Sequence, residues 1–524
     1  MTVCLLLLLE PWTVVYGRAA LEQLHSYDLE MVRAEVTPAA GGGLDVVADL
    51  QMTLKRPGPV VMVASAWIRD LEAASPGTAV TATLGAGVLD EGVRLAAPAG
   101  TDLPTLLTIR SDPPLPVGKA VTIRLQYRWR PRGDGWSYAG SSGAQTHLSG
   151  FWLPVMAHET FQADISLKTP LPAVGPGVRT REGDAWRFRS KAPVQLTPLL
   201  YGDFTIAART VDGRRLEVWT PPGVDWDAEA ALDDTAAVLK TLEGWFGKAV
   251  PDVFRVLVDP RLRPMPSYCA GTFTVIHRSR LPAAVGRARW LALLAHECSH
   301  VWWGYRFKTP IVGGGGTWLR EGLAQWSGIE VAGALLGPGV RQQRYDAMAR
   351  AYLGLADLRR NADGSLFANE ASLRDASYLD DALVPYVRGA LVWRRLAEEI
   401  GAERFRGLLR EWAQRDADQL YDWTILRDQE ELAPLVAYYA ATSRVPDLVL
   451  DYDGKVATVT ATDGAWPGGT VGLRVERKGK TEVVRIPVRN GRGSIEVAGP
   501  VERLELDPRR VHLDPVRSNS IWPR

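Results

Sequence analysis

The sequence predicts a mixed α+β protein built from several domains. The chain has 524 residues, and because a single hydrophobic core rarely serves a chain of that length, three or four domains are expected. Hydrophobic residues alternate with a period of two in the first and last parts of the chain, whereas the middle part combines strands with helical periodicity. We therefore expect an N-terminal antiparallel β domain, an α/β domain with a helical C-terminal lobe, and a small C-terminal β-sandwich.

Residues 1–25 are treated as a separate apolar segment. The run from Val3 to Leu9 is apolar, has no Lys or Arg before it, and is followed by Glu10. Signal peptides begin with positive charge, and a membrane span needs about 20 apolar residues. A truncated signal, an apolar element packed on the body and a membrane-proximal stub all remain open, and so do membrane association and the compartment, whether secreted, periplasmic or cytoplasmic.

Residues 26–210 are predicted to form the β-rich N-terminal domain. Helical periodicity is poor throughout this region, and short runs of β-forming residues are separated by Gly, Pro and Asp. The clearest runs are 44–52, 78–84, 120–127 and 161–167.

Residues 211–445 are predicted to form the α/β domain. A Pro-rich connection leads to an alternation of strands and helices, which is the pattern of an α/β fold. Beyond Gly337 apolar residues recur at spacings of three and four, as they do along helices with one buried face. The expected helices are 227–246, 345–355, 389–400 and 405–412, and the expected strands are 253–258 and 271–277.

Residues 446–524 are predicted to form the C-terminal β-sandwich and a tail. Five strands are separated by turn sequences such as Asp453-Gly454 and Asn490-Gly491. The expected strands are 448–452, 456–461, 471–477, 482–488 and 494–497.

The chemistry of the chain is concentrated in an H-E-x-x-H motif, which runs from His296 through Glu297 to His300. On a helix, two histidines four residues apart lie on one face and can bind one ion, while Glu297 lies beside them. Zn²⁺ accepts two histidines and a carboxylate and keeps its fourth position for water, and Glu321 is the candidate for that carboxylate. The alternative is a helix whose histidines only form hydrogen bonds at a surface. It is disfavoured because the apolar run 290–295 predicts burial, and buried polar groups need partners.

The segment from Trp318 to Ala324 follows this motif, and together the two resemble the aminopeptidase N family of gluzincin peptidases. The resemblance implies a thermolysin-like catalytic domain, one zinc ion held by His296, His300 and Glu321, and a peptide substrate. The spacing between the motifs is two residues longer than is usual in the family, and the glycine run 313–316 is the natural place for that insertion.

Further positions follow from the same resemblance. Glu297 is implied as the general base, and Tyr386, which lies in a segment similar to the family's Y-x-K-G-A element, as the hydrogen-bond donor to the oxyanion. Tyr378 is the alternative for that role. Gly271 and Thr272 are expected on the strand edge that aligns the peptide, and Gln145 is a further substrate-binding candidate from the β domain.

The family's G-x-M-E-N element, whose Glu holds the substrate α-amine, has no acidic counterpart in residues 267–273. An ammonium group removed from water needs a fixed anion nearby. The leading prediction is therefore an aminopeptidase-like zinc peptidase. A zinc endopeptidase or specialised peptidase that does not recognise a free amine is the alternative, and a non-catalytic binding protein on a peptidase scaffold is the third.

Composition gives no support to several other classes of function. The net charge of +1 gives no electrostatic reason to expect nucleic acid as a partner, and oligomeric state is left open. Three cysteines, Cys4, Cys269 and Cys298, cannot make a disulfide framework, and Cys298 is expected to be a buried free thiol. The remaining histidines lack ligand-like spacing and are expected to be structural or exposed; they are His25, His147, His158, His277 and His512.

Overall fold

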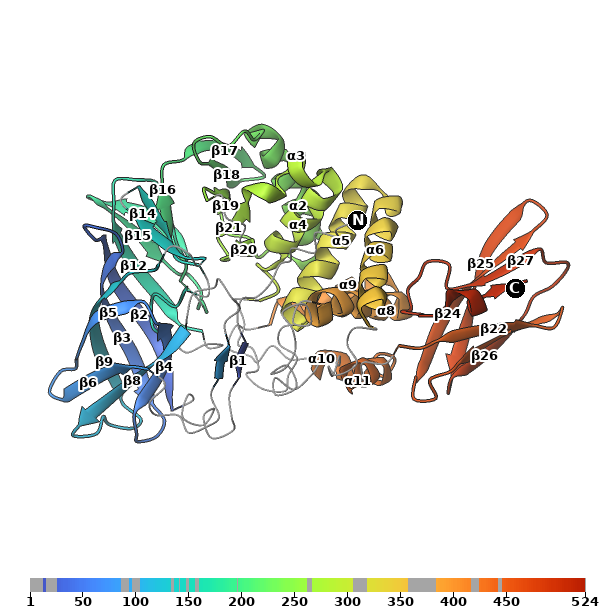
Figure 1. Ribbon diagram of the computed structural model, residues 1–524, viewed down its shortest axis with the longest axis horizontal. Coiled ribbons are helices and arrows are strands. Elements are labelled where there is room, and N and C mark those ends of the chain that lie inside the picture. The colour runs from blue at the N-terminus through green and yellow to red at the C-terminus, as the bar shows by residue number, and fades with distance from the viewer. Residues whose placement is uncertain are drawn as a thin grey trace.

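The computed structural model of the chain has mixed α+β architecture, as predicted. A β-rich part lies at one end, helices and a further sheet lie in the middle, and a smaller β part lies at the other end (Figure 1). The described residues are 13–15, 26–85, 94–96, 104–132, 136–140, 142–147, 150–155, 160–195, 197–261, 266–304, 318–356, 383–415, 424–441 and 445–523. The run from Val3 to Leu9, Cys4, His25, His158, residues 313–316 and Tyr378 lie outside them. The domain boundaries stay predictions.

The N-terminal β part is built around a seven-stranded sheet. Its strands in spatial order are β14 (Val178–Glu182), β15 (Ala185–Arg189), β12 (Gln162–Lys168), β2 (Tyr27–Pro38), β3 (Leu44–Leu54), β9 (Ala120–Trp129) and β5 (Ile68–Ala74). In β3 every second side chain is buried, because alternate residues of a strand face opposite sides of the sheet. The four strands predicted in this region are confirmed, with bounds shifted by at most two residues.

Three smaller sheets accompany it. They are β4 (Val60–Ser65), β8 (Pro104–Asp112) and β6 (Ala79–Leu84); β10 (Tyr138–Gly140), β11 (Gly143–Gln145), β16 (Leu200–Gly202) and β13 (Ala173–Val174); and β1 (Thr13–Val15) with β7 (Arg94–Ala96). The prediction of a purely antiparallel domain is wrong at one place, because β12 pairs in parallel with β2. The chain returns to β2 only after a long connection, and a long connection permits a parallel neighbour.

The central sheet is mixed and has the order β17 (Thr205–Val211), β18 (Arg214–Thr220), β19 (Val253–Asp259), β21 (Phe273–His277) and β20 (Tyr268–Cys269). Between β18 and β19 the chain forms α2 (Ala228–Phe246), which begins where the Asp227 side chain accepts a hydrogen bond from the backbone N–H of Ala230. This crossover makes β18 and β19 parallel, as expected of an α/β unit.

Helices and helical turns follow. They are η2 (Arg278–Arg280), α3 (Pro282–Val285), α4 (Arg287–Ser299), η3 (Trp318–Gly322), α5 (Leu323–Leu336), α6 (Pro338–Ala356), η5 (Leu383–Arg388), α8 (Gly389–Ile400), α9 (Ala402–Ala413), α10 (Thr424–Arg427) and α11 (Ala433–Ala441). The helices predicted from apolar spacing are confirmed, and α8 has the predicted bounds. Within the described parts of the chain, none of the helices combines the length and the apolar character needed to cross a bilayer.

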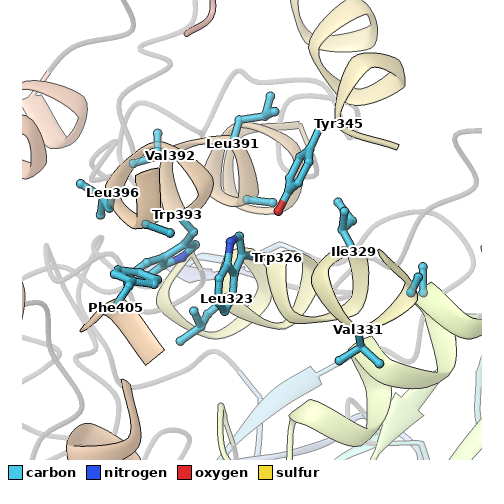
Figure 2. Close-up of a cluster of buried hydrophobic side chains, with 14 of the residues drawn as sticks. Leu323, Trp326, Ile329, Val331, Tyr345, Leu391, Val392, Trp393, Leu396 and Phe405 are labelled. Atoms are coloured by element: carbon cyan, nitrogen blue, oxygen red, sulfur yellow. The ribbon is translucent and has the colours of Figure 1, made fainter. Parts of the chain in front are cut away.

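A tryptophan-rich core joins α5 to α8 and α9 (Figure 2). Trp393 of α8 is fully buried and its ring packs on that of Trp318, with 4.7 Å between the ring centroids. Its indole N–H also donates to the Trp318 backbone oxygen at 3.3 Å. Trp326 of α5 packs edge-on against Phe405 of α9. The turn η3, which contains Trp318, is therefore held in place from α8.

Replacing Trp393 with alanine is expected to destabilise the protein by about 3–5 kcal/mol, because truncation of a buried aromatic side chain leaves a cavity. Denaturant unfolding followed by tryptophan fluorescence measures the change. The control is Val483→Ala, since Val483 is 54% exposed and its truncation should leave stability almost unchanged. An effect at Trp393 no larger than that of the control would contradict this account of the core.

The C-terminal part is one antiparallel sheet with the order β22 (Leu448–Tyr452), β23 (Val456–Ala461), β26 (Arg492–Glu496), β25 (Lys480–Arg489), β24 (Gly468–Arg477), β27 (Arg503–Leu506) and β28 (Ile521–Trp522). The five predicted strands are confirmed. The hydrogen bonds connect all seven strands, but β25 and β26 are joined by a single residue pair, Arg489 with Arg492, beside the turn between them. The β-sandwich stays a prediction. The first and last strands meet where Tyr452 packs on Trp522, with ring centroids 4.8 Å apart.

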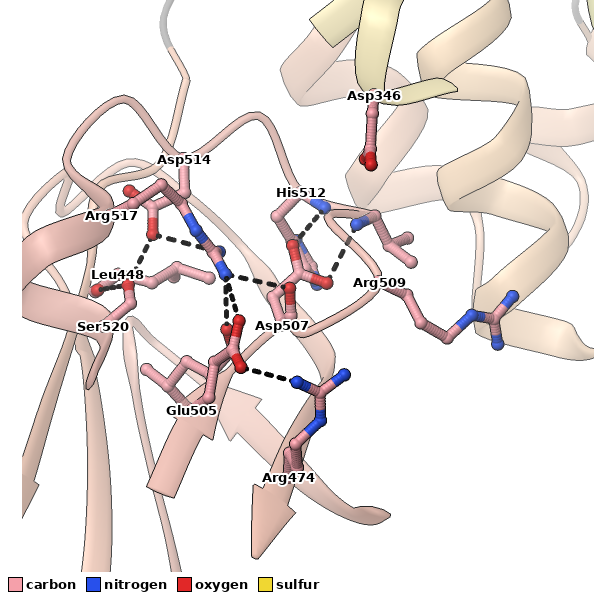
Figure 3. A network of polar contacts seen from close by, with 12 residues as sticks. Asp346, Leu448, Arg474, Glu505, Asp507, Arg509, His512, Asp514, Arg517 and Ser520 are labelled. Carbon is pink, nitrogen blue, oxygen red and sulfur yellow. Dashed lines mark hydrogen bonds and ion pairs between the residues drawn. The ribbon is translucent and has the colours of Figure 1, made fainter. Parts of the chain in front are cut away.

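Hydrogen bonds and ion pairs fix the loop after β27 and its surroundings (Figure 3), and other hydrogen bonds attach this loop to the helices. The loop after β27 is fixed because the Asp507 carboxylate accepts the backbone N–H groups of Val511 and His512, both at 2.8 Å. The 3-10 turn η6 (Arg517–Ser520) lies beside it. From this loop the carbonyl oxygen of Arg509 accepts hydrogen bonds from the Arg394 side chain of α8 at 2.8 Å and from Gln342 of α6 at 2.6 Å.

Candidate metal centre

Helix α4 presents the two histidines of the motif. The run 290–295 is buried, as predicted, and packs the helix into the core. His296 lies in its last turn, and His300 is the C-cap residue with helical backbone angles. The two imidazole rings are therefore neighbours, with centroids 4.9 Å apart and planes at 86°. Both side chains are buried.

Glu321 comes to the same place from the next helical element. It lies in η3, a π-helical turn that leads directly into α5. Its Oε2 atom is 3.4 Å from His296 Nε2 and 3.5 Å from His300 Nε2. One potential ligand atom from each of the three residues lies within 4.8 Å of the others. Two imidazole nitrogens and one carboxylate oxygen make a donor set that fits Zn²⁺.

A glycine allows α5 to approach α4 this closely. A Cβ atom at Gly328 would lie 2.3 Å from the carbonyl oxygen of Ala292 and 3.2 Å from Cβ of His296. Any larger residue would push α5, and η3 with it, away from the histidines. Helix packing thus sets the distance between Glu321 and the two rings.

Hydrogen bonds behind the site fix its side chains. His300 Nδ1 is 2.8 Å from the carbonyl oxygen of Trp303, to which it donates, so Nε2 is the ring nitrogen that faces Glu321 and would bind an ion. Arg320 Nε donates to Glu321 Oε1 at 3.3 Å. The motifs pointed to neither contact, because both depend on how the chain folds after the motif. Arg320 could have been noticed as a second charge, next to Glu321, in a segment whose other residues are uncharged.

Burial and charge set the protonation of the site. Burial by itself would raise the pKa of Glu321, but the charge of His300 and hydrogen bonds from both histidines hold it well below its usual range. Burial lowers the pKa of His300, yet the charge of Glu321 and a hydrogen bond to it raise that pKa to about 9. Glu321 is therefore an anion at neutral pH, and a metal ion would have to displace the proton of His300.

Glu297 lies between the two histidines in sequence and is fully buried. Burial raises the pKa of its carboxyl group to about 8, against a smaller lowering effect from the charge of His300. A carboxylate in such surroundings holds a proton far more readily than one in water. A nearby divalent cation would lower the pKa again.

Tyr386 also lies beside the triad. It belongs to the π-helical turn η5 just before α8, and its ring stacks on that of His296, with centroids 6.1 Å apart and planes at 13°. Glu321 and Tyr386 thus both come from π-helical turns at helix starts, a backbone irregularity found often at functional sites.

Three residues were predicted to bind substrate, and two of them, Gly271 and Thr272, do not lie where the sequence predicted. Gly271 and Thr272 lie in the turn between β20 and β21, not on a strand edge, because Gly271 has a φ of 76° and the turn closes from Thr272 N–H to the Ala270 oxygen. The Thr272 hydroxyl donates to the carbonyl oxygen of Gly175 at 3.2 Å. Gln145 is buried on β11.

The cysteines of this region, Cys269 and Cys298, are both buried and free, as expected for Cys298. Burial raises the pKa of the Cys298 thiol well above its usual value. Such a thiol stays protonated and behaves as a small apolar side chain.

Comparison with known proteins gives one partial similarity. The chain is 23% identical over 270 residues to Aminopeptidase M1-B of Oryza sativa subsp. japonica, and the matched part is 48% of this chain and 29% of that protein. The chain thus spans less than a third of the length of this relative. No family model matches the chain. The similarity is distant, and it is to a protein with the name of an aminopeptidase.

Proposed function

We propose that the protein is a zinc-dependent peptidase, most similar in its action to an aminopeptidase. The main support is the convergence of His296, His300 and Glu321, which brings three potential ligand atoms within 4.8 Å of one another in a buried site. The partial similarity to an aminopeptidase points to the same reaction class. The same three residues would hold one zinc ion.

When bound, zinc would act as a Lewis acid towards the scissile carbonyl group and the attacking water. Glu297 would take a proton from that water and return it to the leaving amine. Tyr386, next to His296, would donate its hydroxyl hydrogen to the oxygen on which negative charge develops. A phenol suits this role because it remains neutral and protonated near pH 7.

A peptidase that does not require a free N-terminus is the second candidate. The segment from Tyr268 to Phe273, which corresponds to the amine-binding element of the resembled family, contains no carboxylate. Tyr268, Gly271 and Thr272 would offer only neutral groups to a substrate ammonium there. This observation favours cleavage of internal or blocked peptide bonds over strict removal of N-terminal residues.

Metal analysis together with a substrate panel tests both candidates. Elemental analysis of the purified protein should find about one zinc per chain, as a single His₂Glu site implies. Amino-acid amides with free amines would be cleaved by an aminopeptidase and N-acetylated peptides would not, whereas the second candidate would cleave the blocked peptides. Bound zinc without any hydrolysis would favour a non-catalytic binding protein, and absence of both zinc and hydrolysis would refute the proposal.

Replacing Tyr386 with phenylalanine is expected to reduce kcat by about 10²–10³-fold with little change in KM, since one donor to the transition state is lost. Zinc content should stay constant, because phenylalanine keeps the ring that stacks on His296. The control is Tyr452→Phe, which removes a hydroxyl bound to Gly454 in the C-terminal sheet and should leave kcat unchanged. Wild-type kcat in the Tyr386 variant would exclude this role.

A further inference from the structure

Arg320 is a buried arginine placed directly beside the candidate metal centre. Its side chain is only 7% exposed, and its Nε atom lies 3.3 Å from Glu321 Oε1. Charged side chains are seldom buried without a partner, and here the contact is with a carboxylate that belongs to the site. The mechanism proposed above does not use this residue.

The two oxygens of Glu321 face different groups. Oε2 lies between the Nε2 atoms of His296 and His300, at 3.4 and 3.5 Å. Oε1 is turned towards Arg320 instead. The guanidinium group thus occupies one oxygen and leaves the other directed at the position that an ion would take.

The backbone beside His300 leaves room for this arrangement. A Cβ atom at Gly304 would lie 2.9 Å from Cδ and 3.1 Å from Cγ of Arg320, and 3.4 Å from Nδ1 of His300. Gly304 has a φ of 138°, which a residue with a side chain rarely adopts. Trp303, the preceding residue, accepts the hydrogen bond from His300. One short backbone segment therefore supports His300 and leaves space for Arg320.

We propose that Arg320 is a positioning residue that holds Glu321 so that the carboxylate offers a single oxygen, Oε2, to the metal. The inference rests on the proposed zinc site and extends it to a residue outside the ligand set. Groups that orient metal ligands typically change metal affinity by about 10–100-fold when they are removed. The positive charge of Arg320 by itself has the opposite effect, since it repels a divalent cation.

These two effects predict opposite results for the variant Arg320→Gln, which removes the charge and the guanidinium donor. If positioning dominates, the Kd for zinc rises by about 10–100-fold. If Arg320 acts only through its charge, zinc binds more tightly in the variant. Competition against a chromophoric chelator, starting from metal-free full-length protein, measures the Kd without reference to activity.

Cobalt substitution provides a second measurement, because the visible absorption of Co²⁺ weakens as its coordination number rises. A Glu321 freed from Arg320 can bind through both oxygens, so the Co²⁺ form of Arg320→Gln should absorb more weakly than that of the wild type. The matched control is Arg341→Gln, in which the lost guanidinium pairs with Glu330 at 3.1 Å on the neighbouring helices. This control should leave both the Kd and the spectrum unchanged.

The variant Gly304→Ala tests the same contact while it keeps the charge of Arg320. Its Cβ atom would displace the Arg320 side chain, so zinc should again bind more weakly, and it serves as the test if Arg320→Gln fails to fold by circular dichroism. Unchanged or tighter zinc binding in a folded variant, with an unchanged Co²⁺ spectrum, would overturn the role of Arg320. Failure of the wild-type protein to bind zinc would instead refute the proposed function.

Discussion

Replacement of Glu297 with glutamine is expected to leave zinc bound and to reduce kcat by about 10²–10⁴-fold, the usual contribution of a general base. Glutamine has nearly the same size and shape as glutamate, so it fits the same buried position on α4. It cannot accept a proton from water, however, and cannot return one to a leaving amine. Steady-state hydrolysis of the best substrate found in the panel, with zinc content measured in the same preparation, checks both halves of the expectation.

The matched control for this variant is Glu330→Gln on α5. Glu330 is bound by Tyr345 at 2.8 Å and by Arg341 at 3.1 Å, and it is not part of the triad. Its replacement should leave kcat unchanged. If Glu297→Gln cleaves peptides as fast as the wild type, Glu297 is not the base; if it loses zinc, the residue has a ligand or structural role instead.

The parts of the fold that could be predicted from sequence are those that local spacing controls. Alternation in 44–52 predicts β3 because one face of that strand is buried, and the apolar spacing in 389–400 predicts α8 with its bounds. The neighbouring positions of His296 and His300 follow in the same way from the helical repeat. Each of these inferences needs only residues that are close together in the chain.

What sequence could not predict depends on partners that are distant in the chain or on departures from regular backbone. The parallel pairing of β12 with β2 joins strands separated by more than a hundred residues, and no local pattern encodes it. Gly271 follows a strand-like pattern, but its positive φ makes a turn. The π-helical turns that present Glu321 and Tyr386 differ from an α-helix by one added residue per turn, which hydrophobic spacing does not reveal.

The contacts behind the candidate metal centre could not be predicted from sequence for a related reason. Arg320 stands next to Glu321 in the sequence, yet adjacent residues on a helix usually point in different directions. The π-helical turn that contains Arg320 and the space beside Gly304 allow the guanidinium group to contact the Glu321 carboxylate. The motif therefore predicts which residues form the site, whereas the surrounding fold determines how each ligand is oriented.

Replacement of Glu321 with alanine is expected to remove the metal. Structural zinc sites bind with about 10–16 kcal/mol shared among their ligands, so the loss of one ligand should cost about 3–4 kcal/mol, or roughly 10²–10³-fold in Kd. One further effect acts in the same direction. The variant leaves the buried Arg320 guanidinium without the Glu321 carboxylate at 3.3 Å, so its positive charge is no longer offset there and opposes a divalent cation.

Elemental analysis after dialysis against a weak chelator measures this loss, with Glu330→Ala as the control that should keep its zinc. Hydrolysis should disappear together with the metal and return in part when zinc is added in excess. The comparison with Glu297→Gln is then decisive, because one variant should lack metal while the other should hold it and remain inactive. If the Glu321→Ala protein retains stoichiometric zinc at wild-type affinity, the Glu321 carboxylate is not a ligand. The proposed set of three ligands would then be wrong.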